Sequence, residues 1–175
     1  MTSVLKVDSI QTAAGKPILN SSGSVLQVVN YQFGSVINLG DARFPYDDTI
    51  PQISEGGEVM TLAITPTAAT SKLMIDVLVN TSPSLSGEKQ VVALFQDTTA
   101  NALACVSEEC YDSSYMFAIA LKYFTSASST SARTYKVRLG RTDSHSNDVT
   151  VNGYAGARKF GGVLATSITI TEIAG

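Results

Sequence analysis

The sequence predicts an all-β protein, an antiparallel two-sheet β-sandwich of the jelly-roll type preceded by an extended N-terminal arm. From Val25 onward, apolar and polar residues alternate with period two, and turn residues interrupt the alternation about every dozen residues. No segment carries an apolar stripe at helical spacing. Only 15% of the residues are charged, and the abundant Ser and Thr suit β-strands and hydroxyl-rich loops.

Residues 1–27 are predicted to form an extended attachment arm, and residues 28–175 a single jelly-roll knob. The apolar residues of the arm are not in helical register, and Ala14–Pro17 and Asn20–Gly23 are turn signals. Such a segment cannot bury its apolar side chains alone, so we expect it to dock on another protein. The residues expected to make this attachment are Val4, Leu5, Val7, Ile10, Ile18 and Leu19.

The strands of the knob follow from the alternation, in chain order. The clearest are Val25–Phe33, Glu58–Thr65, Lys72–Asn80, Gln90–Gln96, Tyr115–Phe124, Arg133–Leu139 and Gly162–Ile173, and weaker candidates are Leu103–Val106 and Val149–Val151. Within Arg133–Leu139, the polar residues Thr134, Lys136 and Arg138 are expected to face water. An immunoglobulin-like sandwich is the alternative, but the chain has no Trp and no widely spaced cysteines.

Charge and targeting patterns exclude several classes. The net charge is -3 with no cluster of Lys or Arg, so nucleic-acid binding is not expected. No apolar run approaches the roughly 20 residues of a membrane-spanning helix. The N-terminus lacks the pattern of a signal peptide, so we expect synthesis and folding in a cytoplasm.

The residues that could carry chemistry do not combine into a known site. Cys105 and Cys110 are expected to be free thiols at assembly, although a later disulfide across this short loop stays open. With one histidine they are too few for zinc. We therefore expect no enzyme, no metal and no cofactor.

Four polar segments contain residues that could form a site, and we interpret each of them as a solvated loop or strand face. His145 would serve a Ser-His-Asp triad, but no G-x-S-x-G elbow accompanies it, and Asp143, Asn147 and Asp148 lack the spacing of a calcium loop. Glu108 and Glu109 are adjacent and should point apart if they lie on a strand, and Asp47–Asp48 is interpreted in the same way. Gly153–Gly162 has no phosphate-loop pattern and is expected to be a mobile loop or hairpin.

Aromatic residues near predicted strand ends and loops are the remaining candidates. They are Tyr31, Phe33, Phe44, Tyr46, Tyr111, Tyr115 and Tyr154. Interfaces favour such residues, so a seam between three copies of the chain is the leading interpretation for Tyr31, Phe33, Tyr111, Tyr115 and Tyr154. Ligand contact, by stacking on sugars, is the alternative.

Two stretches resemble a known family. Leu5–Asn20, followed by Ser24–Val29, is similar to the start of many structural proteins of tailed bacteriophages, cyanophages and other marine phages among them. Leu62–Pro66 with Ala69–Ile75 is similar to a strand–turn–strand of the knobs that follow such arms.

The resemblance implies a virion surface component with a TNF/C1q-like jelly-roll knob, usually a homotrimer, without catalytic residues. Its expected partners are two further copies of itself, a major capsid protein or tail adaptor bound by the arm, and a host surface glycan. Because no coiled-coil or triple-helix shaft separates arm from knob, a head decoration or cement protein is expected. A short tail-fibre or receptor-binding knob is the alternative.

Overall fold

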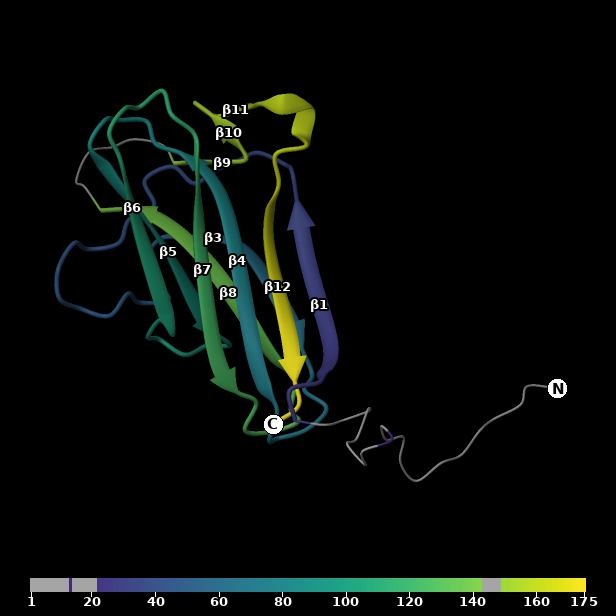
Figure 1. Ribbon diagram of the computed structural model, residues 1–175. Helices are drawn as coiled ribbons and strands as arrows, with labels where there is room; N and C mark the ends of the chain where they lie inside the picture. Colours follow the sequence, from purple (N-terminus) through teal and green to yellow (C-terminus); the bar gives the residue numbers. More distant parts are fainter. Residues whose placement is uncertain (1–12, 14–21, 143–148) are drawn as a thin grey trace.

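Two antiparallel sheets pack face to face in the computed structural model of the protein, which describes residue 13 and residues 22–142 and 149–175 (Figure 1). The first sheet holds, in spatial order, β1 (Val25–Phe33), β12 (Thr166–Ile173), β4 (Lys72–Ser82) and β7 (Phe117–Ser126). The second holds β3 (Gly57–Ile64), β8 (Arg133–Arg141), β5 (Glu88–Gln96) and β6 (Ala104–Cys110).

This strand order is that of a jelly roll. The first strand, β1, pairs with the last, β12, along nearly its whole length. Each connection between consecutive long strands, except that between β5 and β6, crosses from one sheet to the other. This is the arrangement that results when a long hairpin is wound into two facing sheets. In an immunoglobulin sandwich the first strand lies beside the second instead. The predicted fold class is confirmed, and the immunoglobulin-like alternative is wrong.

The remaining elements are short, and the alternation indicated one of them, β9, as the weaker candidate Val149–Val151. They are β2 (Ile37–Asn38), β9 (Thr150–Val151), β10 (Gly153–Tyr154), β11 (Ala157–Arg158) and the 3-10 turn η1 (Phe160–Gly162). The Gly-rich segment forms the β10–β11 hairpin. Because η1 follows it, β12 begins at Thr166 and not at the predicted Gly162.

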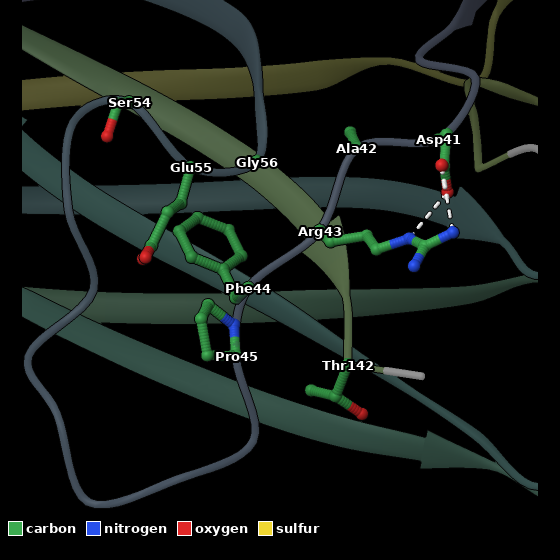
Figure 2. Close-up of a pocket in the computed structure, with 9 residues that line it drawn as sticks. All are labelled: Asp41, Ala42, Arg43, Phe44, Pro45, Ser54, Glu55, Gly56 and Thr142. Atoms are coloured by element: carbon green, nitrogen blue, oxygen red, sulfur yellow. Dashed lines mark hydrogen bonds and ion pairs between the residues drawn. The ribbon is translucent and has the colours of Figure 1, made fainter. Parts of the chain in front are cut away.

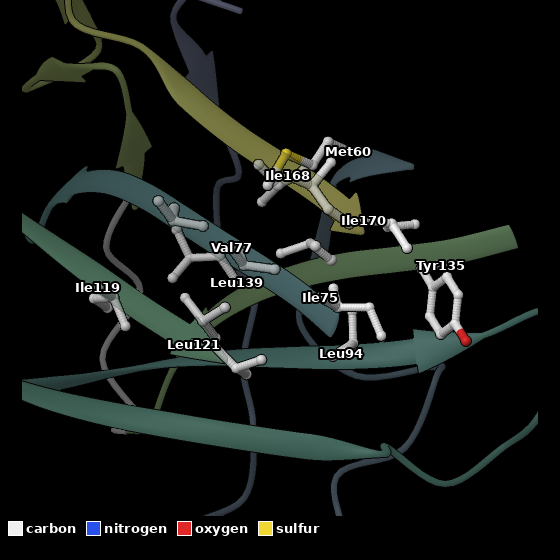
Figure 3. Close-up of a cluster of buried hydrophobic side chains, with 14 of the residues drawn as sticks. Met60, Ile75, Val77, Leu94, Ile119, Leu121, Tyr135, Leu139, Ile168 and Ile170 are labelled. Carbon is white, nitrogen blue, oxygen red and sulfur yellow. The ribbon is translucent and has the colours of Figure 1, made fainter. Parts of the chain in front are cut away.

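The main core lies between the sheets and is built from alternate residues of the long strands (Figure 3). On β8, Tyr135, Val137 and Leu139 are fully buried, whereas the polar residues between them are partly exposed, as predicted. The core cluster extends across both sheets and includes Leu73, Ile75, Val77, Val79, Val92, Leu94, Ile119, Leu121, Ile168 and Ile170.

A smaller core lies on the outer face of the second sheet. The chain between β2 and β3 crosses this face and packs Phe44 against Val91, Ala93 and Phe95 of β5. The Phe44 ring lies so close to the backbone of β8 that a Cβ on Gly140 would meet it at 2.9 Å. Phe44 is only 1% exposed, so its prediction as a candidate contact aromatic is wrong.

The two ends of the sandwich differ in what they carry. At one end, which we call the root end, β1 begins beside the end of β12: the Gly23 N–H donates to the Ala174 carbonyl and the Ala174 N–H to the Ser24 carbonyl, both at 2.8 Å. The chain before residue 22 therefore joins the sandwich here, next to Gly175. The opposite, far end carries the β4–β5 and β6–β7 loops and the β10–β11 hairpin (Figure 1).

The predicted boundary of the arm falls inside an element. Val25–Gln27 belong to β1, so the sandwich begins slightly before the predicted start of the knob at residue 28. The residues predicted to attach the arm all lie outside the described part of the chain.

Candidate functional site

Four large apolar side chains project into solvent at the far end of the sandwich. Tyr111 is 83% exposed and Tyr115 62% exposed on the β6–β7 loop, while Phe160 is 71% and Val163 83% exposed between β11 and β12. We call these four residues the distal rim. Large apolar groups exposed at the same end of a molecule, rather than scattered singly over it, indicate a contact surface.

A tight hydrogen-bonded turn presents Tyr115. One carboxylate oxygen of Asp112 accepts bonds from the Ser114 N–H and the Ser114 hydroxyl, both at 2.8 Å. The backbone carbonyl of Asp112 accepts the Tyr115 N–H at 3.2 Å. The bonds from Ser114 lower the pKa of Asp112, which keeps this cap ionised at neutral pH. The ring of Tyr115 therefore stands on a fixed support.

Two asparagines, the partly exposed Asn80 and the buried Asn152, hold the other side of the rim. The Asn80 side chain on β4 donates to the Ala165 carbonyl at 2.6 Å and so fixes the chain just before β12. Asn152 is fully buried; its amide donates to the Phe33 carbonyl at 2.9 Å, and its oxygen accepts the Thr166 hydroxyl at 2.8 Å. These bonds tie β1, β12 and the far-end hairpin together.

Two hollows meet at Tyr115. Their volumes are about 450 Å³ and about 420 Å³, and both are lined by Tyr115, Met116, Phe117 and Ala118. The first, toward β12, is completed by Asn80, Ser114, Phe160 and Leu164. The second, toward β6, is completed by Glu108, Glu109, Cys110 and Tyr111. Tyr115 is thus shared by two adjoining recesses with apolar walls and a few polar groups.

The charges lining these hollows are both negative. The Glu109 carboxylate lies 3.0 Å from the Lys89 ammonium, and its hydrogen bond and charge raise the pKa of Lys89. Glu108 lies opposite Gln90, and among the described residues no ion pair forms to it. Among the residues that the structure describes, no lysine or arginine lines either hollow.

The aromatic residues predicted as contacts separate into groups. Tyr111 and Tyr115 come together at the distal rim, while Tyr31 and Phe33 stack on β1 with ring centroids 5.9 Å apart. Tyr154 lies in β10 beneath the Lys159 ammonium, 5.7 Å from the ring centroid.

Sequence reasoning missed Phe160 and Val163 of the rim. Phe160 follows directly after the short strand β11, in a Gly-rich stretch with no periodic pattern. The sequence feature that could have indicated Phe160 is an aromatic residue inside a turn-forming segment, where its side chain has no strand face on which to pack.

A second candidate surface is the outer face of the first sheet. Its register places Val28, Thr171, Met74 and Phe124 in one row across β1, β12, β4 and β7. Val28 is 57% and Phe124 56% exposed. We call this surface the open face, because in the described part of the chain no loop packs over it as residues 39–56 pack over the other sheet.

The open face carries little charge. In the row next to Val28, Lys122 and Asp76 form a cross-strand ion pair at 3.0 Å, and the Asn30 amide donates to the Thr169 hydroxyl at 2.8 Å. The remaining charged residue at an outward position of the four strands is Lys72. A nearly neutral sheet face with an apolar row suits burial against another protein surface.

A third hollow, of about 530 Å³, lies beside the segment that covers the second sheet (Figure 2). Asp41 occupies its edge and accepts two hydrogen bonds from the Arg43 guanidinium, at 2.6 and 2.8 Å. Asp41 also pairs with the buried Arg141. The arginine that lines the hollow, Arg43, is therefore engaged with Asp41, and the described residues of its lining offer a ligand no unpaired cation.

The cysteines and the paired glutamates do not form a site. Cys105 and Cys110 are free thiols, and they lie on β6 with their partners Ala93 and Glu88 on opposite faces of the sheet. The disulfide left open by the sequence does not form. Glu108 and Glu109 likewise point to opposite faces, because they are adjacent on the same strand.

The remaining sequence candidates give no site. In the described ranges no three metal-ligating side chains come together, and no helix there is long and apolar enough to cross a membrane. Asp47 accepts hydrogen bonds from Thr49 in an exposed loop. His145, Asp143, Asn147 and Asp148 lie outside the described residues.

Comparisons with known proteins find similarity of structure alone. No family model matches the sequence, and no curated protein matches it. Among solved structures, the sugar-binding C-terminal domain of EclA is 15% identical with a TM-score of 0.34, covering 83% of this chain and 86% of that one.

Viral chains are also similar in structure, at comparably low sequence identity. A chain of infectious bursal disease virus, Gx strain, is 9% identical with a TM-score of 0.42 over 96% of this chain and 43% of that one. In the VP2 subviral particle of the same virus the identity is 11% and the TM-score 0.39, over 86% and 38%. The chain thus spans less than half of either viral chain. At such identities and TM-scores the similarity concerns the β-sandwich and carries no information on function.

Proposed function

We propose that the protein is a bacteriophage virion structural protein: a homotrimeric jelly-roll knob that decorates or cements the head and is anchored by its N-terminal arm. The observation that carries the proposal is the division of the sandwich into a root end and a far end. The chain before residue 22 joins the sandwich at one end, and the exposed aromatic loops lie at the other. An anchored knob needs this polarity, because its attachment and its outward loops must not compete for the same end.

The resemblance of Leu5–Asn20 to the arms of tailed-phage structural proteins supports the attachment role. Because these residues are mostly uncharged and half of them are apolar, attachment would rest on apolar burial and added backbone pairing. Such a contact resists high salt and yields to mild denaturant. Three arms engaged together would strengthen it further through effective concentration.

The open face supports the homotrimer. Three copies arranged around an axis would each bury an apolar row such as that of Val28, Met74 and Phe124 against a neighbour. The second sheet has no comparable need, because the chain itself covers Phe95 and its neighbours. The protein would act through binding alone, on the virion surface, after synthesis in the host cytoplasm.

Removal of the arm tests the attachment. We expect a variant lacking residues 1–21 to fold and trimerise, because β1 and its pairing to β12 stay complete, and to be absent from particles. Incorporation is measured by mass spectrometry of purified virions from a phage carrying the truncated gene. Full occupancy of the truncated protein would contradict the proposal.

A short tail fibre or receptor-binding knob is the alternative. The distal rim favours it, since four exposed apolar side chains at the end away from the arm are suited to contact with a host surface. Separated heads and tails decide between the two. A protein that copurifies with heads, and whose deletion makes capsids burst more easily, is a decoration. One that copurifies with tails, and whose deletion abolishes adsorption, is a fibre.

A further inference from the structure

We infer that the two hollows at Tyr115 form a binding site for an uncharged oligosaccharide. The site goes beyond the proposed function, because it would serve a knob on either the head or the tail. It consists of the distal rim together with the recesses on the two sides of Tyr115.

The form of the hollows fits sugar rings. A pyranose has one face of C–H groups and a rim of hydroxyls, so it packs on an aromatic ring and leaves its hydroxyls for polar groups and water. The Tyr115 ring borders both recesses, and Tyr111 and Phe160 each add a largely exposed ring to one of them. Aromatic surface that must remain in water when the site is empty is better supplied by tyrosine than by aliphatic residues, since its hydroxyl stays hydrated.

The polar groups fit the same ligand. Glu108 borders one recess, and Asn80 and Ser114 border the other. A carboxylate accepts hydrogen bonds from sugar hydroxyls, and an amide or hydroxyl can both accept and donate. Glu108 borders the recess toward β6 and has no ion pair among the described residues, whereas Glu109 is paired with Lys89, so an acidic sugar would be repelled by Glu108. The charge of the site thus selects uncharged glycans over uronic or sialic acids.

The arrangement also sets the length of the ligand. The recesses share Tyr115, Met116, Phe117 and Ala118 and then diverge toward β12 and toward β6. A monosaccharide could occupy one recess, whereas a chain of several sugars could enter both. An oligosaccharide should therefore bind more tightly than its monomer.

The support of Tyr115 keeps the ordering cost of binding low. The Asp112–Ser114 bonds hold the loop, and the Asn80 amide holds the opposite wall at Ala165. A site whose side chains are already held loses less conformational entropy when a ligand binds.

Calorimetry on the purified full-length protein tests the inference. The probes are maltotetraose, cellotetraose and chitotetraose, with glucose and trigalacturonic acid for comparison. We expect at least one neutral tetrasaccharide to bind with a dissociation constant below about 10 mM, and to bind more tightly than glucose does. We expect Tyr115→Ala to weaken that binding about tenfold, the loss of one stacking contact, and Tyr115→Phe, which keeps the ring, to preserve it.

Ile50→Ala is the matched control, because Ile50 is also exposed, at 53%, but lines neither hollow. Ile50 lies in the segment that the Gln52–Asn101 bridge joins to the β5–β6 loop. The variant should bind as the wild type does. Circular dichroism verifies that each variant is folded, which is expected because the Tyr115 side chain is largely exposed.

Three results would overturn the inference. They are no binding of any neutral tetrasaccharide, equal binding by Tyr115→Ala, and tighter binding of trigalacturonic acid. A tenfold loss in Tyr115→Phe would place the contact on the hydroxyl and refute stacking. None of these outcomes bears on incorporation into virions, so failure here and failure of the proposed function are distinguishable.

Discussion

At the scale of single residues, Glu172 on β12 joins three elements of the sandwich through one carboxylate. Its side chain is fully buried, yet its oxygens accept hydrogen bonds from the Gln27 amide at 2.6 Å and from the Thr67 N–H at 2.8 Å. Burial by itself raises the pKa of this carboxyl, but hydrogen bonds, chiefly those from Gln27 and Thr67, outweigh burial and lower the pKa to about 2. One carboxylate thus fastens β1 and the β3–β4 turn to β12 at the root end.

The depressed pKa predicts how stability depends on pH. Ionised Glu172 stabilises the folded state fully above its ordinary pKa of 4.5, and this contribution is lost as pH falls from 4.5 toward about 2. At about 1.4 kcal/mol per pKa unit, the contribution is on the order of 3 kcal/mol. We expect Glu172→Gln to lower the free energy of unfolding by about that amount at pH 7, because one amide cannot accept all these donors.

Urea unfolding across this acidic range tests the Glu172 prediction. The Glu172→Gln variant should lose much less stability on acidification than the wild type does. Glu109→Gln is the control, since its ion pair with Lys89 is partly exposed, and it should change stability by less than about 1 kcal/mol. An acid-induced loss in Glu172→Gln as large as that of the wild type would refute the assignment.

At the scale of elements, the strands show how far period-two alternation determines this fold. On β4, Leu73, Ile75 and Val77 are buried, and the residues between them point outward. The long strands could be predicted from the sequence because each presents one face to the core over many residues. Of the two-residue strands, β9 was indicated only as the weaker candidate Val149–Val151, and the others were not predicted, since alternation needs length to be visible.

The candidate site was less predictable for a physical reason. Tyr111 and Tyr115 could be singled out as aromatics beside a strand end, but their partner Phe160 comes from a loop remote in sequence. The jelly-roll winding brings these loops to the same end, and that winding has no local signature. Phe44 shows the converse, because Gly56 and Gly140 accommodate its ring and their role is visible only in three dimensions.

A pair of neighbouring substitutions on β4 tests the alternation. We expect Ile75→Ala to cost about 2–5 kcal/mol, because it leaves a cavity between the sheets. Asp76→Ala, one residue along, should cost less than about 1 kcal/mol, since its ion pair with Lys122 is largely solvent-exposed. Urea denaturation of the two variants measures both values. Equal costs would mean that the register of β4 is wrong.

At the scale of the whole molecule, the two outer faces of the sandwich differ in how far the chain itself covers them. Residues 39–56 cover the second sheet and bury Phe44 and Phe95, whereas the open face leaves Val28 and Phe124 more than half exposed. A chain that covers one sheet with its own loop has no need of a partner there. In the proposed homotrimer, a neighbouring copy would complete the burial at the open face.

A charge on the open face tests the oligomer. We expect the wild type to be a trimer by light scattering at micromolar concentration, and Phe124→Glu to be a folded monomer, because an unpaired carboxylate would be buried in the seam. Ile50→Glu, on the segment that covers the other sheet, should stay trimeric. A monomeric wild type, or a trimeric Phe124→Glu variant, would contradict the homotrimer.

The pairing of Ser24 with Ala174 has a practical consequence for display of foreign peptides. Both ends of the sandwich-forming chain emerge at the root end, so under the proposed attachment a peptide appended after Gly175 would be directed toward the surface to which the arm is proposed to bind. There it would compete with attachment and be shielded from antibodies. The β4–β5 loop at the far end, where a Cβ on Gly87 would meet open space, is the insertion point that would hold cargo outward.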